Sequence, residues 1–148
     1  GNGHLAFAVL TATFNGFPLV YTGQESAMDK KLEFFKKDVI PWGDYKYAPF
    51  YKTLFDLKHK NKALWNGEHG GPLTKIKTGN DEHIYAFTRE KDGDKVLVVI
   101  NLSSTPQKAT LKGVSGIYTD VFSAATLEIK DGANIDLKAW DYLVYSNK

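Results

Sequence analysis

The sequence contains no cysteine among its 148 residues. This absence excludes a disulfide framework, a zinc site built on thiolates and a cysteine nucleophile. An excess of one sign of charge is also missing. The chain has 19 Lys and Arg and 17 Asp and Glu, which gives a net charge of only +2. So small an excess provides no basic surface for nucleic acid, and we expect no nucleic-acid partner. The four histidines follow no spacing typical of metal ligands, so we expect no metal and no cofactor.

A long unbroken hydrophobic run is missing as well. The most apolar stretch, residues 5–21, is interrupted by polar or helix-breaking residues, which are Thr11, Thr13, Asn15, Gly16 and Pro18. A membrane span needs about 20 consecutive apolar residues, so we expect no membrane association. The stretch also lacks the basic start and small-residue cleavage pattern of a signal peptide, and nothing in the sequence assigns a localisation.

The first half of the chain carries helix and strand patterns in turn. The run from His4 to Phe14 is apolar on every face, which predicts a helix buried on all sides. The run from Phe17 to Tyr21 predicts a short buried strand of the parallel type. A long loop over residues 26–47 follows. The apolar spacing after Pro49 then predicts a second helix, which ends at Asn66-Gly67.

From Pro72 onward, short β-branched and aromatic runs recur about every ten residues, with turn residues between them. Asp92-Gly93 and Asp131-Gly132 are typical of hairpin turns, because glycine tolerates the positive φ angle of a tight turn. This spacing predicts an antiparallel sandwich or barrel. The expected strands are residues 73–77, 83–88, 95–102, 108–111, 117–122, 126–129, 135–137 and 142–145.

The two halves therefore differ in kind, and we place the boundary between residues 1–67 and residues 68–148. A single parallel strand cannot make a sheet, because it needs neighbours on both sides. The first half thus has the pattern of the last helix–strand–helix of a larger α/β domain. The expected fold class is mixed: this incomplete unit is followed by an all-β antiparallel sandwich.

Two segments carry a family resemblance. Asn15 to Glu25 (NGFPLVYTGQE) resembles the Gly-x-Pro-x-x-Tyr-x-Gly-x-Glu segment at the eighth barrel strand of the α-amylases, glycoside hydrolase family 13. Residues 50–64 resemble the helix that follows, although Lys58 and Lys62 stand where the family commonly has Arg and Pro. The β-rich tail falls where the family carries its C-terminal sandwich. The resemblance implies that residues 1–67 are the remnant of a (β/α)8 barrel, here called the barrel remnant.

The resemblance also bears on chemistry. Family members act on α-glucans and maltooligosaccharides with retention, through an Asp nucleophile and a Glu acid, and a further Asp supports the distorted sugar. In the family all three lie on strands that precede the segment matched here. The resemblance therefore implies no catalytic residue in this chain, and we expect that the chain alone does not hydrolyse starch.

Three side chains are the candidate substrate-binding residues. Gln24 and Glu25 follow the C-terminal end of a barrel strand, which is the active-site face of that fold, and Trp42 is a flat aromatic that can stack on a sugar ring. The alternatives are that Glu25 anchors its loop and that Trp42 packs the loop on the barrel. Trp65 and Trp140 border the sandwich, and we expect them in a core or an interface.

A second interpretation is a free-standing β-sandwich module that binds a glycan or a partner protein. Such a module should not open with a helix that is apolar on every face, which favours the barrel remnant. The remnant in turn predicts exposed hydrophobic surface and a homo-oligomer that forms through it.

Overall fold

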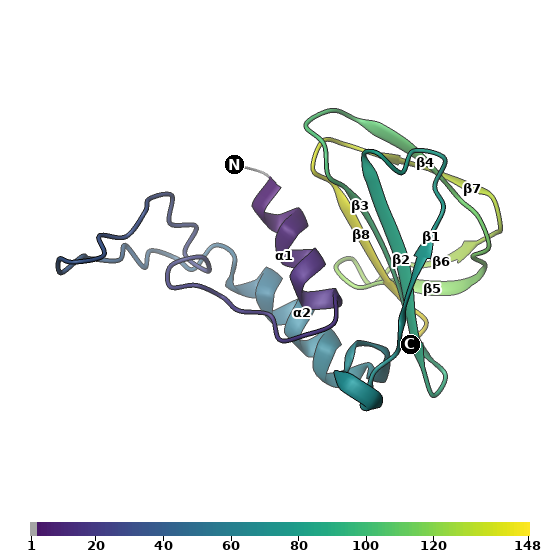
Figure 1. The fold of residues 1–148 in the computed structure, drawn as a ribbon, viewed down its shortest axis with the longest axis horizontal. Helices are drawn as coiled ribbons and strands as arrows, with labels where there is room; N and C mark the ends of the chain where they lie inside the picture. The colour runs from purple at the N-terminus through teal and green to yellow at the C-terminus, as the bar shows by residue number, and fades with distance from the viewer. Residues whose placement is uncertain (1–2) are drawn as a thin grey trace.

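The computed structural model describes residues 3–148, so the first two residues of the expected 1–67 unit lie outside the described part. Two helices are followed by two short 3-10 helices and then by eight strands (Figure 1). The helical elements are α1 (Gly3–Thr13), α2 (Ala48–Lys60), η1 (Lys62–Leu64) and η2 (Gly67–His69). The strands are β1 (Leu73–Ile76), β2 (Ile84–Lys91), β3 (Asp94–Asn101), β4 (Gln107–Leu111), β5 (Gly116–Asp120), β6 (Thr126–Ile129), β7 (Ala133–Leu137) and β8 (Tyr142–Ser146).

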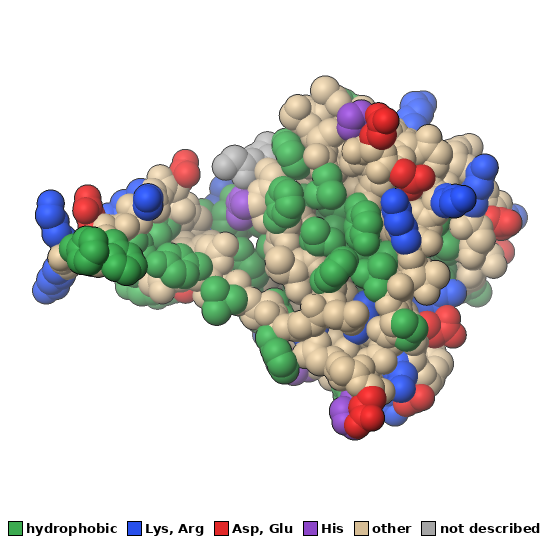
Figure 2. Space-filling model, viewed as in Figure 1, with side chains coloured by type: hydrophobic (Ala, Val, Ile, Leu, Met, Phe, Trp, Pro, Cys, Tyr) green, Lys and Arg blue, Asp and Glu red, His purple; other side chains and the backbone are tan. Residues whose placement is uncertain are grey.

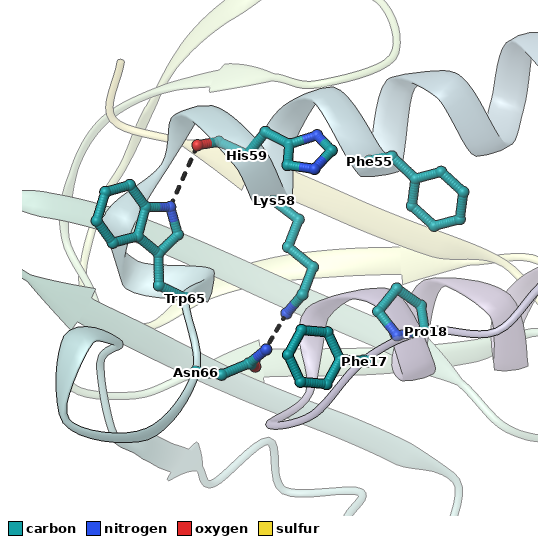
Figure 3. A pocket seen from close by; sticks show the side chains of 7 residues that line it. All are labelled: Phe17, Pro18, Phe55, Lys58, His59, Trp65 and Asn66. Carbon is teal, nitrogen blue, oxygen red and sulfur yellow. Dashed lines mark hydrogen bonds between the residues drawn. The ribbon is translucent and has the colours of Figure 1, made fainter.

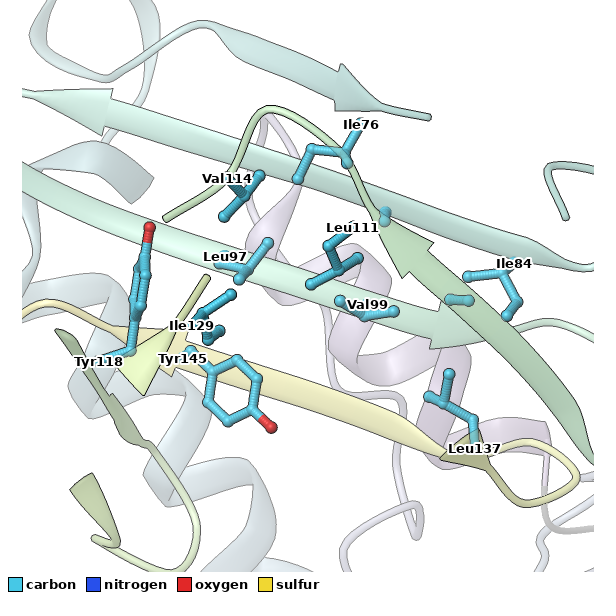
Figure 4. Packing of buried hydrophobic residues seen from close by; sticks show 12 residues of the cluster. Ile76, Ile84, Leu97, Val99, Leu111, Val114, Tyr118, Ile129, Leu137 and Tyr145 are labelled. Atoms are coloured by element: carbon cyan, nitrogen blue, oxygen red, sulfur yellow. The ribbon is translucent and has the colours of Figure 1, made fainter. Parts of the chain in front are cut away.

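The strands form two antiparallel sheets, which confirms the expected all-β sandwich. The larger sheet has the order β1-β2-β3-β8-β5-β6, and the smaller one pairs β4 with β7. Alternate side chains of the larger sheet, among them Leu97, Val99 and Tyr145, meet Leu111 and Leu137 of the smaller sheet (Figure 4). This cluster is the core of the sandwich.

The helices cover the other face of the larger sheet. Ala6, Val9 and Ala12 form one face of α1 and share a second buried cluster with Val98 of β3 and Val144 of β8. Figure 1 shows α1 and α2 side by side, and α1 contacts both β3 and β8. Because β3 is covered on both faces, its run from Val96 to Ile100 is wholly buried, which explains why that strand is continuously apolar instead of alternating.

Two expectations for the first segment are wrong. Phe17 to Tyr21 forms no strand, and Phe17 and Leu19 are 88% and 79% exposed. The physical reason is that a strand needs a neighbour to hydrogen-bond with, and no strand of the described residues pairs with this segment. The helix α1 forms as expected but is not buried on all sides, because Phe7 remains 50% exposed.

The two expected hairpin turns behave differently. Asp92 and Gly93 have φ angles of 50° and 83° and join β2 to β3 as a hairpin. Asp131-Gly132 instead carries the chain from β6 of the larger sheet to β7 of the smaller one, so it is not a hairpin. The side-chain Oδ1 of Asp131 accepts a 2.6 Å hydrogen bond from the backbone amide of Gly113. A turn signal reports the local bend, whereas strand pairing depends on which sheet each strand joins.

Candidate substrate-binding site

Gln24 lies on a tight turn that follows the extended segment. Its backbone amide donates to the Tyr21 carbonyl over 3.0 Å, and its side-chain Oε1 accepts from the Tyr21 amide over 2.5 Å. Gly23 precedes it with a φ of 90°, a conformation that favours glycine. The side chain of Gln24 is exposed and lines a hollow of about 360 Å³ together with Lys46 and Tyr47. The structure thus places Gln24 at the rim of a hollow, with its amide oxygen engaged by its own turn.

Glu25 points toward the first turn of α2. Its backbone carbonyl accepts a 2.9 Å hydrogen bond from the amide of Tyr47, which ties the turn to the start of that helix. Within residues 3–148, its Oε2 atom and the hydroxyl of Tyr51 are both shielded from solvent and take no hydrogen-bond partner. The pKa of Tyr51 is raised, first by burial and then by the negative charge of Glu25. These contacts fit the loop-anchoring alternative, and a substrate role for Glu25 stays a prediction.

Trp42 lies farther out on the loop that joins the two helices. Its ring stacks on Tyr45 with centroids 5.9 Å apart and an interplanar angle of 21°. The two residues are 42% and 45% exposed, so the stacked pair presents aromatic surface to solvent. Trp42 does not line the hollow at Gln24, and the structure does not bring the three predicted residues into one site. Its role in stacking on a sugar stays a prediction.

The loop of residues 26–47, here called the arm, extends away from the body of the molecule (Figure 1). Hydrophobic and lysine side chains follow one another along this arm in the space-filling view (Figure 2). Phe34 and Phe35 are 89% and 93% exposed and contact each other edge to face at 4.8 Å. Most of the side chains on the arm therefore lack a packing surface within the described residues.

The main feature that sequence reasoning missed is Arg89. It is the only arginine of the chain and is 1% exposed on β2. Its guanidinium donates to five main-chain carbonyls, at 2.7 to 3.4 Å; they belong to Thr13, Phe14, Leu64, Trp65 and Gly71. Burial lowers its pKa. A signal was present in the alternation of β2, because Arg89 follows Tyr85 and Phe87 on the face that turns toward the helices.

Arg89 works with a close approach of the backbone at Gly70. A Cβ atom added to Gly70 would lie 1.7 Å from the carbonyl oxygen of Trp65 and 3.0 Å from Nη2 of Arg89. At Gly71 an added Cβ would lie 2.4 Å from the carbonyl oxygen of Glu90. Residues 61–72 form the link between α2 and β1. Gly70 and Gly71 allow this link to pack against β2.

Trp65 belongs to this link, and Lys58 lies beside it. The Nζ of Lys58 donates to the Leu64 carbonyl over 2.7 Å, and burial followed by the nearby charge of Arg89 lowers its pKa. Trp65 is 39% exposed, so the expectation that it lies in a core or an interface is wrong within the described residues. Trp140 is half-buried, and its ring lies against Gly3 of α1, where an added Cβ would meet it at 3.1 Å.

Residues 3–148 contain no group of three or more His, Cys, Asp or Glu side chains arranged to hold a metal ion. In the same residues, no helix has the length and hydropathy needed to cross a membrane.

Comparison with known proteins finds relatives of the β-sandwich. Residues 73–144 match the family model described as the maltogenic amylase C-terminal domain. A cyclomaltodextrinase from Thermoanaerobacter pseudethanolicus is 30% identical over 112 residues, which make up 73% of this chain and 18% of the relative. The chain spans about a fifth of the length of the curated relatives that it matches.

Solved structures agree on the fold. The maltogenic α-amylase AmyB from Thermotoga neapolitana matches with a TM-score of 0.77 and 18% identity, over 98% of this chain and 36% of that chain. AmyP, solved in complex with maltose, matches with a TM-score of 0.73 and 16% identity, over 98% of this chain and 34% of that chain. With its final barrel elements followed by a β-sandwich, the chain thus resembles the C-terminal part of α-amylase-family proteins.

Proposed function

We propose that the chain is the C-terminal part of a retaining glycoside hydrolase that acts on α-glucans, and that it is inactive by itself. The observation that carries the proposal is the match of residues 73–144 to the maltogenic amylase C-terminal domain. The likeness to a cyclomaltodextrinase and to a protein solved with maltose supports an α-glucan or maltooligosaccharide as the substrate.

The proposed reaction needs two carboxyl groups. One carboxylate attacks the anomeric carbon while a carboxylic acid protonates the departing oxygen, and water then hydrolyses the covalent glycosyl intermediate with retention. We assign neither group to this chain. The chain contributes the rim of the cleft instead: Gln24 offers an amide beside its hollow, Glu25 holds the turn against α2, and Trp42 offers an exposed ring.

The proposed division of the chain keeps the boundary between residues 67 and 68. The barrel remnant and the sandwich nevertheless share the buried cluster that α1 and α2 form with β3 and β8. We propose that the sandwich supports the end of the barrel through this cluster. The exposed side chains of Phe17, Leu19, Phe34 and Phe35 support a further proposal, that the isolated chain associates with copies of itself.

Inactivity is tested directly. The purified chain is incubated with β-cyclodextrin and with maltoheptaose, and the products are separated by chromatography. We expect neither substrate to be cleaved, whereas turnover that co-purifies with the chain would overturn the assignment of the catalytic groups to another part of the enzyme.

The rim is tested by binding. Maltotriose is titrated into the chain while the indole N–H resonance of Trp42 and the side-chain amide of Gln24 are followed by NMR, with the β-linked cellotriose as the stereochemical control. We expect both resonances to shift with maltotriose, and the Trp42→Ala variant to keep the shift at Gln24, because the two residues do not share one hollow. Equal shifts with cellotriose, or none with either sugar, would contradict the proposed rim.

A further inference from the structure

A groove in the sandwich lies apart from both helices. It measures about 390 Å³ and lies between β1, β2, the start of β3 and the loop of residues 112–115 that joins β4 to β5. Ile76 and Val114 are buried at the groove and belong to the core of the sandwich, where Figure 4 shows them. Its volume is within the range of small-molecule sites.

No described residue of the barrel remnant lines this groove. The helices pack on the opposite face of the larger sheet, in the cluster that includes Val98 and Val144. The larger hollow of about 520 Å³ beside Trp65 differs in this respect, because Phe17 and Pro18 of the barrel remnant line it (Figure 3). The opening of the groove in the sandwich therefore does not depend on what packs against the barrel remnant.

The charged side chains at this groove are all lysines, and it is here called the lysine groove. The four are Lys75, Lys77, Lys95 and Lys112, and none of the described residues that line the groove is Asp or Glu. Lys75 is engaged outside the lining, because its Nζ lies 3.9 Å from the carboxylate of Asp81. Positive charge gathered in a hollow without acids disfavours a cationic ligand and attracts an anion.

The other three ammonium groups are available to a ligand. Lys77 and Lys112 are exposed, and within residues 3–148 neither takes part in an ion pair. Lys95 has one acidic neighbour, Glu90, at 3.7 Å, and Glu90 is largely exposed. An exposed pair of this kind contributes little, so an anion in the groove can compete for Lys95.

Two threonine hydroxyls stand beside these lysines. Thr74 and Thr88 are partners across β1 and β2, and Thr88 is in turn the partner of Leu97 on β3. Alternate residues of a strand share a face, so Lys95 lies on the same face as Leu97 and diagonally from Thr88. The register thus places two hydroxyl donors next to an ammonium group, and each can donate to a ligand oxygen.

A buried hydroxyl lies near the same loop. Tyr118 is 2% exposed, and within the described residues its hydroxyl has no hydrogen-bond partner. A Cβ atom added to Gly116 would lie 3.9 Å from this oxygen, which places the hydroxyl next to the end of the loop that carries Lys112. Buried hydroxyls normally have a partner, so this end of the sandwich offers a donor that a bound water or ligand oxygen can satisfy.

The composition of the lining narrows the ligand class. None of the described residues that line the groove is aromatic, so no ring is offered on which a sugar or a nucleobase could stack. A carboxylate brings a single charge. A phosphate monoester carries about −1.5 to −2 charges near pH 7 and three strong acceptor oxygens, which suits several ammonium groups and two hydroxyls together.

We propose that the lysine groove binds a phosphate dianion, either free or as the monoester group of a small molecule. The two sources share the chemistry that the lysines and threonines recognise, and the volume leaves room for a small group attached to the phosphate. The proposal does not rest on the proposed glucan activity, because it uses no catalytic group and no residue of the barrel remnant.

The test is a titration of the full chain with inorganic phosphate and with glucose 6-phosphate, in about 150 mM NaCl to screen weak surface attraction. The backbone amide resonances of Thr88 and Gly113 are followed by NMR, and glucose is the ligand control. We expect both phosphates to shift these resonances and glucose to leave them unchanged. Tighter binding of glucose 6-phosphate identifies a monoester as the ligand, whereas equal affinity identifies free phosphate.

Variants test the residues. Lys95→Gln and Lys112→Gln should each weaken phosphate binding about fivefold, which is the upper range for one exposed charge pair. The matched control is Lys108→Gln, which removes the same charge from an exposed lysine outside the groove and should leave the affinity within about twofold. Because Lys112 is exposed, Lys112→Gln should fold normally, and thermal unfolding checks this.

Three outcomes would overturn the inference. The first is the absence of a shift at Thr88 and Gly113 with either phosphate. The second is an equal shift with glucose, which would make the phosphate group irrelevant to binding. The third is an equal loss of affinity in Lys108→Gln and Lys112→Gln, which would mean that the net charge of the chain, and not this groove, attracts the anion. None of these outcomes bears on the cleavage test of the proposed function.

Discussion

The guanidinium of Arg89 donates a 2.7 Å hydrogen bond to the main-chain carbonyl of Trp65. The same side chain reaches the carbonyls of Thr13 and Phe14 at the end of α1, where a helix leaves carbonyl groups without partners inside the helix. A cation is also favourable at that end of a helix dipole. One strand residue of the sandwich thus joins the end of the first helix to the link that follows the second.

We predict that Arg89→Met lowers the free energy of unfolding by about 3 kcal/mol, because it removes several charge-assisted hydrogen bonds and leaves buried carbonyls unpaired. Arg89→Lys should recover only part of this loss, since an ammonium cannot span five carbonyls from one position. Urea unfolding followed by circular dichroism measures both variants.

The matched control for Arg89 is Lys108→Met. Lys108 pairs with Asp136 at 3.4 Å, and both side chains are largely exposed, so its loss should change the free energy of unfolding by less than about 0.5 kcal/mol. If Arg89→Met and Lys108→Met were equally mild, the buried arginine would not hold the two parts of the chain together.

Gly70→Ala should destabilise the fold by about 3 kcal/mol, because the added methyl group would lie 1.7 Å from the Trp65 carbonyl oxygen and force that link to move. Thermal unfolding is the measurement. Gly67→Asn is the control: nothing lies within 4 Å of its added Cβ, and asparagine tolerates the φ of 59° found there. A Gly70→Ala variant as stable as the control would show that the close approach relaxes freely.

The β-sandwich could be predicted from the sequence because its signals are local. Runs such as residues 94–101 alternate with turn residues, and each strand expected after Pro72 overlaps an observed one. Asp131-Gly132 shows the limit of such signals: the bend is where the sequence places it, but its strands join different sheets. Which strands pair with each other depends on how the two sheets pack, and a short stretch of sequence does not contain that information.

The candidate site was harder to predict, because it depends on contacts between distant segments. The run from Phe17 to Tyr21 has the composition of a buried strand, yet it lies exposed for want of a neighbouring strand. Arg89 lies 76 residues from Thr13, and only its place in the alternation of β2 hinted that it turns inward. Gln24, Glu25 and Trp42 were named from a family motif and a residue type, and neither determines how far apart they lie.

Asp94 should make stability depend on pH. Its carboxylate pairs with Lys148 and accepts a 2.8 Å hydrogen bond from the Lys62 amide, and these contacts lower its pKa below 3.8. A lowered pKa in the folded state contributes stability above pH 3.8, and this contribution is lost as the pH falls through the folded value.

Asp94→Asn should therefore cost about 1 to 2 kcal/mol at pH 7 and progressively less below pH 4. Urea unfolding of both proteins across that range gives the difference. Asp136→Asn, at an exposed pair, should show almost no difference at any pH. A constant gap between Asp94→Asn and the parent sequence down to pH 2 would mean that lost packing, and not charge, explains the cost.

The exposed arm predicts self-association of the isolated chain. Phe34 and Phe35 expose nearly all of their surface, and each large apolar side chain removed from water favours association by about 1.5 to 3 kcal/mol at full burial. Native mass spectrometry and sedimentation velocity over a concentration series should show species larger than 16.5 kDa. The double variant Phe34→Ser with Phe35→Ser should shift the distribution toward the monomer.

The same double variant separates association from folding. Because the two side chains contact each other and are 89% and 93% exposed, their replacement should leave the free energy of unfolding of the monomer within about 0.5 kcal/mol of that of the unmodified chain. Replacing Lys36 and Lys37, the charged neighbours on the arm, by Ser tests whether charge repulsion limits association, and it should increase the larger species. If the unmodified chain stayed monomeric at high concentration, association through the barrel remnant would be contradicted. The exposed apolar side chains would then not drive association.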